Sequence, residues 1–451
     1  MLYFSFLSKH LYPLYESFRG RKTHLYYREY LANQHKTPDE IAAIQLQKLK
    51  ALLHHCQLHV PYYQKSWREL GFDPASVQSV ADLNQLPLLT KSLVRQHYDE
   101  LIASNFRGKN ITKTTGGSTG EPFRFEHDRE NYDRRQGVAW RGYGWAGYEL
   151  GDKSLYYWGG AIGRVAKKAA LKDKLYNMML GRNVLNVFYM DKDNIHRFVD
   201  EIFSFKPHGI VGYTSPLFEV AQYILEKNIK VPSLGWIISA AEPLYESQRE
   251  IIEQAFATKV FNTYGCREFT LIGAECSHQQ GLHLNTDHLV VEVTDDFGQG
   301  TQGIGNMTIT DLHNYGMPLI RFVNGDLGKL KQTSCSCDLP FPLLESVEGR
   351  KLDKIVTREG KIIPGEFFPR LFREMREVER YQVVQEHLDR IEINIVALPG
   401  LDSAAMEHSI QSAVKAVVGQ ELSVFFHYVD AIALTASGKN RVTISKLDVA
   451  S

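Results

Sequence analysis

One stretch decides the fold, residues 209–265: GIVGYTSPLFEVAQYILEKNIKVPSLGWIISAAEPLYESQREIIEQAFATKVFNTYG. Three short apolar runs in it are typical of buried strands: Gly209–Gly212, Trp236–Ser239 and Lys259–Phe261. The segments between these runs, about 216–228 and 245–257, favour helices. Strands and helices alternating at this spacing predict a parallel sheet covered by helices.

The same pattern extends upstream and locates the expected ligand site. Residues 191–206 repeat apolar side chains at helical spacing. In sheets of this kind the ligand lies beyond the carboxyl ends of the strands. Two segments fall at such ends, Ala240–Pro243 and Thr263–Gly265. We therefore expect both segments to border a ligand.

The pattern changes after about residue 350. Two strands around His387–Asp389, a helix over about 403–418, a strand at Ser423–Tyr428 and a tail with Ser437–Lys439 follow. We expect an α/β protein in two domains. The first, residues 1–349, is a large domain with mixed or parallel sheets covered by helices. The second, residues 350–451, is a small, mobile α+β domain.

Composition limits the class of protein. The 451 residues include 52 Lys and Arg against 52 Asp and Glu, and 43% are apolar. A general nucleic-acid binder needs excess cations to displace counterions from phosphates, so a balanced chain argues against one. Five cysteines, an odd number, are typical of a reducing compartment, and we expect a cytoplasmic protein.

The N-terminal stretch MLYFSFLSKHLYPLY is apolar and aromatic. Lys9, His10 and Pro13 interrupt it before it reaches the roughly 18 uncharged residues of a spanning helix. It also lacks the features of a secretory signal. We interpret it as a buried or surface-lying helix. The alternative is weak contact with a membrane surface, aided by the cations of Arg19–Lys22.

The segment TTGGSTGEP, Thr114–Pro122, is the strongest local signal for a ligand. Its glycines free backbone N–H groups to face an anion, and its hydroxyls add donors. It is neither a Walker A loop nor a dinucleotide fingerprint. An ordinary surface loop explains the composition equally well.

Three further segments carry candidate side chains. Tyr264–Glu268 offers an aromatic ring for a base and a carboxylate for a hard cation such as Mg²⁺. Asp326 follows a glycine turn and suits ribose hydroxyls, although Asn-Gly-Asp is also a common plain turn. Lys439 follows Gly438 in a tail where a lysine could move into a site. The alternative for Tyr264–Glu268 is a strand end with a solvated glutamate, and the alternative for Lys439 is a solvated lysine.

The order of these segments is more specific than any one of them. The series TTGGSTGEP, SAAEPL, NTYGCRE, RFVNGDLG, EGRKLDK and ASGKNR resembles the motifs of adenylate-forming enzymes. The nearest resemblance is to the phenylacetate–coenzyme A ligase-like branch, capsular polysaccharide biosynthesis type. The upstream segment that ends in LNQLPLLTK also resembles that branch. The resemblance covers about residues 48–445.

The resemblance implies a role for each segment. ATP phosphates would lie against the glycine-rich loop, adenine would lie between the Glu242 segment and Tyr264, and Glu268 would hold Mg²⁺. Asp326 would hold the ribose hydroxyls, with Arg350 nearby. Lys439 would bridge the carboxylate and the α-phosphate as a catalytic residue, with a hinge near Asp353. The implied nucleotide-binding residues are Thr115, Gly116, Gly117, Ser118, Thr119, Gly120, Ala241, Glu242, Tyr264, Gly265, Asp326 and Arg350.

The chain departs from the family pattern at the loop. Glu121 stands where the family often has lysine, so a cationic phosphate contact is missing or supplied elsewhere. We expect an ATP-dependent, AMP-forming carboxylate ligase that passes its acyl group to coenzyme A or to an amine or hydroxyl acceptor, including a sugar in polysaccharide biosynthesis. Glu121 motivates the alternative, a catalytically inactive, zinc-stabilised nucleotide-binding module.

Cysteine and histidine spacing suggests a structural zinc site. Cys335 and Cys337 supply two thiolates in a polar loop, and Cys276 precedes His283 in ECSHQQGLHL. Three cysteines and one histidine suffice for a closed tetrahedral site, with His278 as an alternative ligand. Small buried or free thiols are the other reading. Similar positions in the resembling branch favour zinc, and leave Cys56 and Cys266 as structural thiols.

Overall fold

The computed structural model describes residues 7–115, 123–159, 167–187, 190, 193–350, 355–363, 367–372, 375, 377–398, 400–420, 422–433 and 442–447. Its contacts divide the chain into two compact units. The first comprises Met1–Thr115 and Phe123–Gly349, and the second contains Arg350–Ser451. Independent movement of the second unit stays a prediction.

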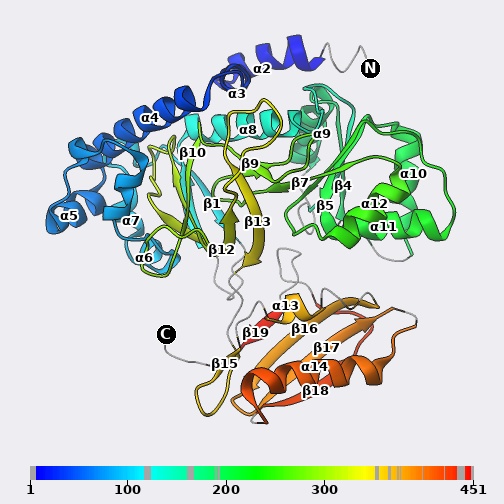
Figure 1. Ribbon diagram of the computed structural model, residues 1–451. Coiled ribbons are helices and arrows are strands. Elements are labelled where there is room, and N and C mark those ends of the chain that lie inside the picture. The colour runs from blue at the N-terminus through cyan, green and yellow to red at the C-terminus, as the bar shows by residue number, and fades with distance from the viewer. Residues whose placement is uncertain are drawn as a thin grey trace. The chain divides into compact units, whose positions relative to one another are not determined.

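The first unit is built on an 11-stranded mixed sheet in the order β10-β11-β12-β13-β9-β8-β7-β6-β5-β3-β4 (Figure 1). Its bounds are β3 Ser154–Trp158, β4 Arg182–Asn186, β5 Gly209–Tyr213, β6 Trp236–Ala240, β7 Val260–Tyr264, β8 Gly273–Ala274, β9 Leu282–Leu284, β10 Leu289–Thr294, β11 Gly305–Asp311, β12 Phe322–Leu330 and β13 Leu343–Arg350. Strands β4, β3, β5, β6 and β7 are parallel, whereas β7-β8-β9-β13 and β10-β11-β12 pair antiparallel.

A separate hairpin and a set of helices complete this unit. The hairpin consists of β1 Ile111–Thr115 and β2 Phe123–His127. The α-helices are α2 Tyr12–Phe18, α3 Thr23–Asn33, α4 Pro38–His59, α5 Pro61–Leu70, α6 Lys91–Gln96, α7 Tyr98–Leu101, α8 Arg129–Gly144, α9 Lys167–Met179, α10 Ile195–Phe205, α11 Thr214–Glu226 and α12 Glu246–Phe256. Short π or 3₁₀ segments lie at η1 Leu7–Leu11, η2 Pro74–Ser76, η3 Val80–Gln85 and η4 Ser104–Phe106.

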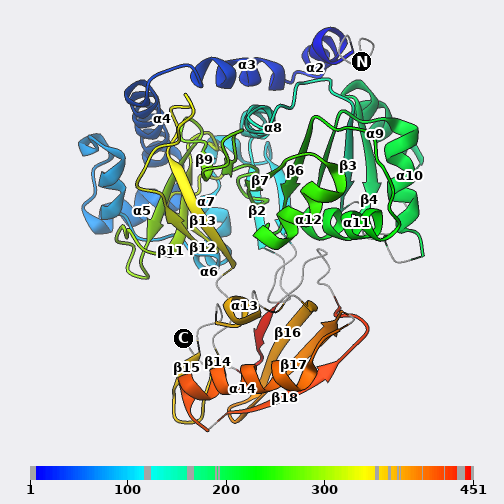
Figure 2. The ribbon, with the colours of Figure 1, turned by 45° about the vertical axis from the view of Figure 1, so that its right-hand side comes forward.

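Both faces of the parallel strands are buried, and α11 and α12 lie over one of them (Figure 2). Ile210 of β5 and Ile237 of β6 pack in the cluster that α10, α11 and α12 cover. Their neighbours Val211 and Ile238 pack on the opposite face with Tyr12, Trp140 and Trp236. Because successive side chains of a strand point to opposite faces, a strand covered on both sides is apolar throughout. The predicted α/β fold with a covered sheet is confirmed.

The second unit has a four-stranded sheet in the order β18-β17-β16-β19 and a two-stranded pair, β14-β15. The bounds are β14 Ile355–Val356, β15 Ile362–Ile363, α13 Phe367–Phe372, β16 Val378–His387, β17 Arg390–Ala397, α14 Ser403–Val418, β18 Ser423–Tyr428 and β19 Thr443–Ser445. Met406, Ile410 and Val414 of α14 pack on Ile391 and Ile393 of β17. This unit therefore has an apolar core of its own.

None of the described helices combines the length and the apolar character that a membrane-spanning segment needs.

Candidate functional site

Tyr264, at the end of β7, is hydrogen-bonded to the part of β12 where its register with β11 shifts. Its hydroxyl donates to Asp326 Oδ2 at 2.8 Å and accepts from Asn324 Nδ2 at 2.7 Å. Asn324 Nδ2 also donates to Asp326 Oδ2 at 3.0 Å. Burial and the charge of Asp326 raise the pKa of Tyr264 well above its usual value, which keeps the phenol protonated as a donor. Among the described residues Asp326 Oδ1 has no donor, so this oxygen is the one left to accept from a ligand.

The backbone is constrained at both strand ends. Ala241, just after β6, has φ 69°, in the left-handed region that glycine adopts more easily than alanine. Gly265, just after β7, lies so close to the carbonyl oxygen of Thr270 that a Cβ would clash with it. Strained and tightly packed backbone of this kind is common where a loop is held against a ligand.

The carboxylate of Glu242 has a local partner. Its Oε2 accepts from the backbone N–H of Ser215 at 2.7 Å, in the first turn of α11. The hydroxyl of Thr214 donates to the carbonyl oxygen of Glu242 at 3.1 Å. A carboxylate at a helix N-terminus satisfies a free N–H group and complements the helix dipole. The side chain of Glu242 thus fixes the loop that is expected to border adenine.

Glu268 is buried, with 4% of its surface exposed. Burial, followed by the charges of Glu268 and Asp326, raises the pKa of the neighbouring Cys266 thiol well above its usual value. The two carboxylates thus act on the same thiol, which stays protonated and unreactive. Burial lowers the pKa of Arg135, whereas the negative charge of Glu268 acts to raise it. The guanidinium of Arg135 donates a hydrogen bond to the carbonyl oxygen of Arg267. Both Glu268 and Asp326 therefore lie near the Cys266 thiol.

The ends of the hairpin that carries the glycine-rich loop are anchored at this site. Arg267 Nη1, next to Glu268, donates to the carbonyl oxygen of Thr114 in β1 at 2.7 Å. On the other side, the ring of Phe123 in β2 stacks on Phe322 in β12 with centroids 5.5 Å apart. The fold therefore holds β1 against the segment after β7, and β2 against β12.

Lys91 is a cation at this site to which the sequence analysis assigned no role. Its Nζ donates to the carbonyl oxygen of Asn324 at 2.7 Å and lies 6.0 Å from the ring centroid of Phe123. The chain before it runs beside β12, because Leu89 N donates to Arg321 O and Val323 N donates to Leu89 O, each at 2.9 Å. A signal for Lys91 was present in the sequence, because the family-like segment LNQLPLLTK ends on this lysine. Its contact with Asn324 could not be seen there, since 233 residues separate the two.

Several predicted residues lie outside the described part of the chain. These are Gly116, Gly117, Ser118, Thr119, Gly120, Glu121, Asp353 and Lys439. The side chains of Thr115 and Arg350 also lie outside it, although their backbones end β1 and β13. Of the residues expected to bind the nucleotide or Mg²⁺, the structure describes the side chains or backbone of Ala241, Glu242, Tyr264, Gly265, Glu268 and Asp326.

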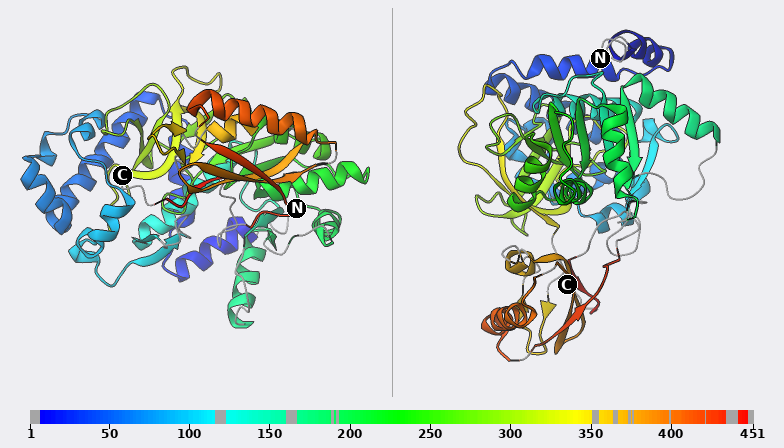
Figure 3. Two further views of the ribbon diagram at one scale, coloured as in Figure 1. Left: turned by 90° about the horizontal axis from the view of Figure 1, so that it is seen from below. Right: turned by 90° about the vertical axis from the view of Figure 1, so that its right-hand side faces the viewer.

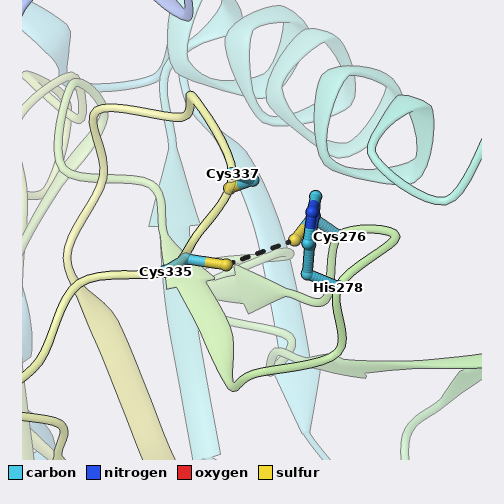
Figure 4. Close-up of side chains that lie close together, drawn as sticks. All are labelled: Cys276, His278, Cys335 and Cys337. Carbon is cyan, nitrogen blue, oxygen red and sulfur yellow. Dashed lines mark hydrogen bonds between the residues drawn. The ribbon is translucent and has the colours of Figure 1, made fainter.

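The three cysteines predicted as metal ligands come together (Figure 4). Sγ of Cys276 and Sγ of Cys335 are 3.7 Å apart. The donor atoms of Cys276, His278, Cys335 and Cys337 all lie within 4.8 Å of one another. Thiolates 2.3 Å from a tetrahedral zinc ion would be separated by about 3.8 Å. The donor set and its spacing therefore fit a metal ion of this type.

Two histidines lie close to the three thiols, and which of them would be the fourth ligand stays a prediction. His278, the alternative, belongs to the four-residue group, whereas His283 does not. His283 is held in β9 beside the group, with Nδ1 3.1 Å from the carbonyl oxygen of Phe341 and Nε2 3.3 Å from Sγ of Cys337. Since a carbonyl cannot donate, Nδ1 carries the proton and Nε2 presents its lone pair to Cys337.

Comparison with solved structures identifies the class of this fold. A crystal structure of 2-hydroxyisobutyryl-coenzyme A ligase in the postadenylation state superposes with a TM-score of 0.71. The match covers 92% of both chains at 19% sequence identity. A large α/β unit with a mixed sheet and a separate C-terminal sheet unit is the adenylate-forming ligase fold.

Relatives in sequence narrow the assignment. "Protein CapK" of Staphylococcus aureus is 25% identical over 439 residues, 95% of this chain and 94% of the relative. A phenylacetate–coenzyme A ligase of Thermus thermophilus is 26% identical, covering 79% and 81%. Residues 355–446 match the CapK C-terminal domain. The chain is homologous to CapK and to the phenylacetate–coenzyme A ligases, and these homologues indicate an AMP-forming ligase.

Proposed function

We propose that this protein activates a carboxylic acid with ATP, releases pyrophosphate and passes the acyl group from the acyl-adenylate to an acceptor. The single observation that carries the proposal is the Tyr264–Asn324–Asp326 network beside Lys91. A carboxylate with one oxygen fixed by two donors and one oxygen left over suits a ribose diol. The homology to AMP-forming ligases supports the nucleotide as its ligand.

The proposed first step joins two anions. A carboxylate oxygen forms a bond to the α-phosphorus of ATP, and the bond from that phosphorus to the bridging β-oxygen breaks, which releases pyrophosphate. Cations must neutralise the charge that accumulates at the phosphates. We propose that Lys91, whose Nζ donates to the Asn324 carbonyl oxygen, supplies the positive charge that Glu121 does not. Glu268 would hold Mg²⁺, which adds positive charge when bound. Lys439 is the lysine proposed for the α-phosphate.

The molecule that accepts the acyl group is proposed separately from the activation step. Coenzyme A is the acceptor named for the phenylacetate–coenzyme A ligases among the relatives. The resemblance to enzymes of polysaccharide biosynthesis makes an amine or hydroxyl of a sugar the second candidate. A thioester results in the first case, and an amide or an ester in the second. Both begin with the same acyl-adenylate.

A screen with hydroxylamine tests the activation step without knowledge of the acceptor. Carboxylic acids are incubated singly with enzyme, ATP and Mg²⁺, and the activated acyl group is trapped as a hydroxamate. We expect one chemical class of acid to give hydroxamate and pyrophosphate in equal amounts. The productive acid is then offered coenzyme A or amino and hydroxyl sugars in place of hydroxylamine, and the faster acceptor defines the second step.

Glu121 favours a second candidate function, a nucleotide-binding module without catalysis. This candidate predicts that ATP binds and that no acid stimulates pyrophosphate release. Calorimetric titration with ATP beside the hydroxamate screen separates the two functions. Binding without turnover across a broad panel of acids would favour the module.

We further propose that the cluster of Cys276, Cys335, Cys337 and a histidine holds a structural zinc ion. Its ligands come from two loops, one after β8 and one between β12 and β13. Closing such loops on a metal ion adds the binding free energy to the stability of the fold. The apolar side chains of Trp145 and Phe341 pack around the cluster, which suits a closed structural site.

A further inference from the structure

The N-terminal helices and α9 form an exposed apolar surface. Ser8 Oγ donates to the carbonyl oxygen of Met179 at 2.7 Å, and the rings of Tyr12 and Tyr176 meet edge to face with centroids 6.0 Å apart. Figure 3 shows α9 standing out from the sheet beside these helices in both views. Two segments that are far apart in sequence thus share one surface.

Each helix has a buried face and an outer face. In α2, Tyr12 and Glu16 are buried, and the Tyr12 hydroxyl donates to Glu16 Oε1 at 2.7 Å. The outer face carries large apolar side chains at helical spacing. They are Leu11, Leu14 and Phe18 at the N-terminus, which are 43%, 67% and 88% exposed, and Leu175 and Met178 of α9, which are 48% and 42% exposed.

The charge of these segments is strongly positive, although the whole chain is neutral. Residues 7–22 and α9 together hold eight Lys and Arg against two Asp and Glu. Glu16 is turned inward, and Arg21 is bound to Asp133 at 2.9 Å. Among the side chains that the structure describes in these two segments, the exposed charges are the cations Arg19, Lys22 and Lys174 and the acid Asp173.

We propose that this surface docks the protein on an anionic lipid bilayer. Apolar side chains on the outer face of a helix enter the boundary between headgroups and acyl chains, while flanking cations contact the anionic headgroups. A bilayer with anionic headgroups accounts for the excess of cations around these apolar side chains, whereas a protein partner would not require it.

Flotation of the full-length protein with lipid vesicles tests this proposal. The vesicles contain either equal parts of phosphatidylglycerol and phosphatidylcholine or phosphatidylcholine alone. We expect binding to the anionic vesicles only, and its loss in high salt. The double variant Leu14→Ser/Phe18→Ser should bind at least about tenfold more weakly. The matched control is Phe297→Ser, because Phe297 is 90% exposed in the turn after β10.

A charge variant tests the second half of the surface. Arg19→Glu/Lys22→Glu should abolish binding at moderate salt, whereas Lys65→Glu/Arg68→Glu on α5 has the same spacing and should leave it intact. Circular dichroism and hydroxamate formation show that each variant is folded. Equal binding to both kinds of vesicle, or an equal loss in the control variants, would overturn the proposal. So would failure to bind together with a Leu14/Phe18-dependent dimer in sedimentation, which would make the surface an interface between copies.

Discussion

The hydroxyl of Tyr264 donates to Asp326 Oδ2 at 2.8 Å, across the 62 residues that separate them in sequence. This bond joins the end of β7 to the irregular part of β12 and fixes one oxygen of the carboxylate. An aspartate held in this way is rigid enough for the ribose contact that we propose.

Asp326→Asn should reduce kcat/KM for ATP by about 10- to 100-fold, because a charge-assisted hydrogen bond to a ribose hydroxyl is lost. Tyr264→Phe should raise the KM for ATP severalfold with little change in kcat, since it frees the carboxylate without removing it. Initial rates of pyrophosphate release at varied ATP check both. An unchanged KM in both variants would remove Asp326 from the nucleotide site.

Lys91→Met should lower carboxylate-dependent pyrophosphate release by about 10- to 100-fold, because the cation that we propose to neutralise the phosphates is removed. Lys65→Met, at an exposed position on α5, is the control and should keep full activity. Equal rates for the two variants would show that Lys91 only holds the Asn324 carbonyl.

Purified protein should contain about one zinc ion per chain, measured by plasma mass spectrometry on samples prepared without chelators. Cys335→Ser should lose the metal, and Cys56→Ala, which changes a buried thiol elsewhere, should retain it. Comparison of His278→Ala with His283→Ala decides which ring nitrogen is the fourth ligand. Metal-free wild-type protein would refute the site.

Ala241→Gly should raise the free energy of unfolding by about 0.5–1 kcal/mol, because glycine adopts a φ of 69° without the strain that alanine carries. Ala240→Gly, in β6, should instead lower it. Urea unfolding monitored by tryptophan fluorescence measures both. A destabilised Ala241→Gly variant would mean that the methyl group packs usefully at this turn.

Acid should destabilise the first unit. Burial holds the pKa values of His127, His288 and His313 well below the usual 6.5, so the folded state binds fewer protons than the unfolded state below that pH. Their contribution is complete above pH ~6.5 and is lost as the pH falls, with a slope of up to about 4 kcal/mol per pH unit for three protons. The pKa of Asp311, which burial raises to about 6, acts in the opposite direction by one proton at most.

The pH dependence is checked by urea unfolding between neutral pH and pH ~5. His288→Gln should flatten the slope relative to wild type, although it will lower stability at neutral pH by removing the 2.8 Å bond to Tyr30. His54→Gln, at an exposed position, is the control. Identical slopes for all three proteins would show that the buried histidines are not responsible.

Local patterns were sufficient to predict the fold. The helix expected at 403–418 and the strand expected at 423–428 match α14 and β18. Such elements can be predicted because the face of a helix or strand that packs on its neighbours must be apolar, and this sets the spacing of apolar residues. The order of the motifs likewise indicated the class of enzyme that the homologues support. These features depend on residues that are close in sequence.

Tertiary relationships could not be predicted in the same way. No local pattern shows that Lys91 meets the Asn324 carbonyl, because the contact depends on the pairing of Leu89 with β12. Nor does spacing distinguish His278 from His283, since both follow Cys276 within a few residues and only the path of β9 separates them. The roles of Lys439 and of Gly116–Gly120 stay predictions.

The central claim is that the chain is a carboxylate-activating enzyme, and pyrophosphate release tests it most directly. With ATP, Mg²⁺ and the acid found in the hydroxamate screen, wild-type protein should release pyrophosphate at a rate that depends on the acid. Lys439→Ala should lower that rate by at least about a hundredfold while ATP still binds. Acid-independent release of phosphate, or an unchanged rate in Lys439→Ala, would contradict the account.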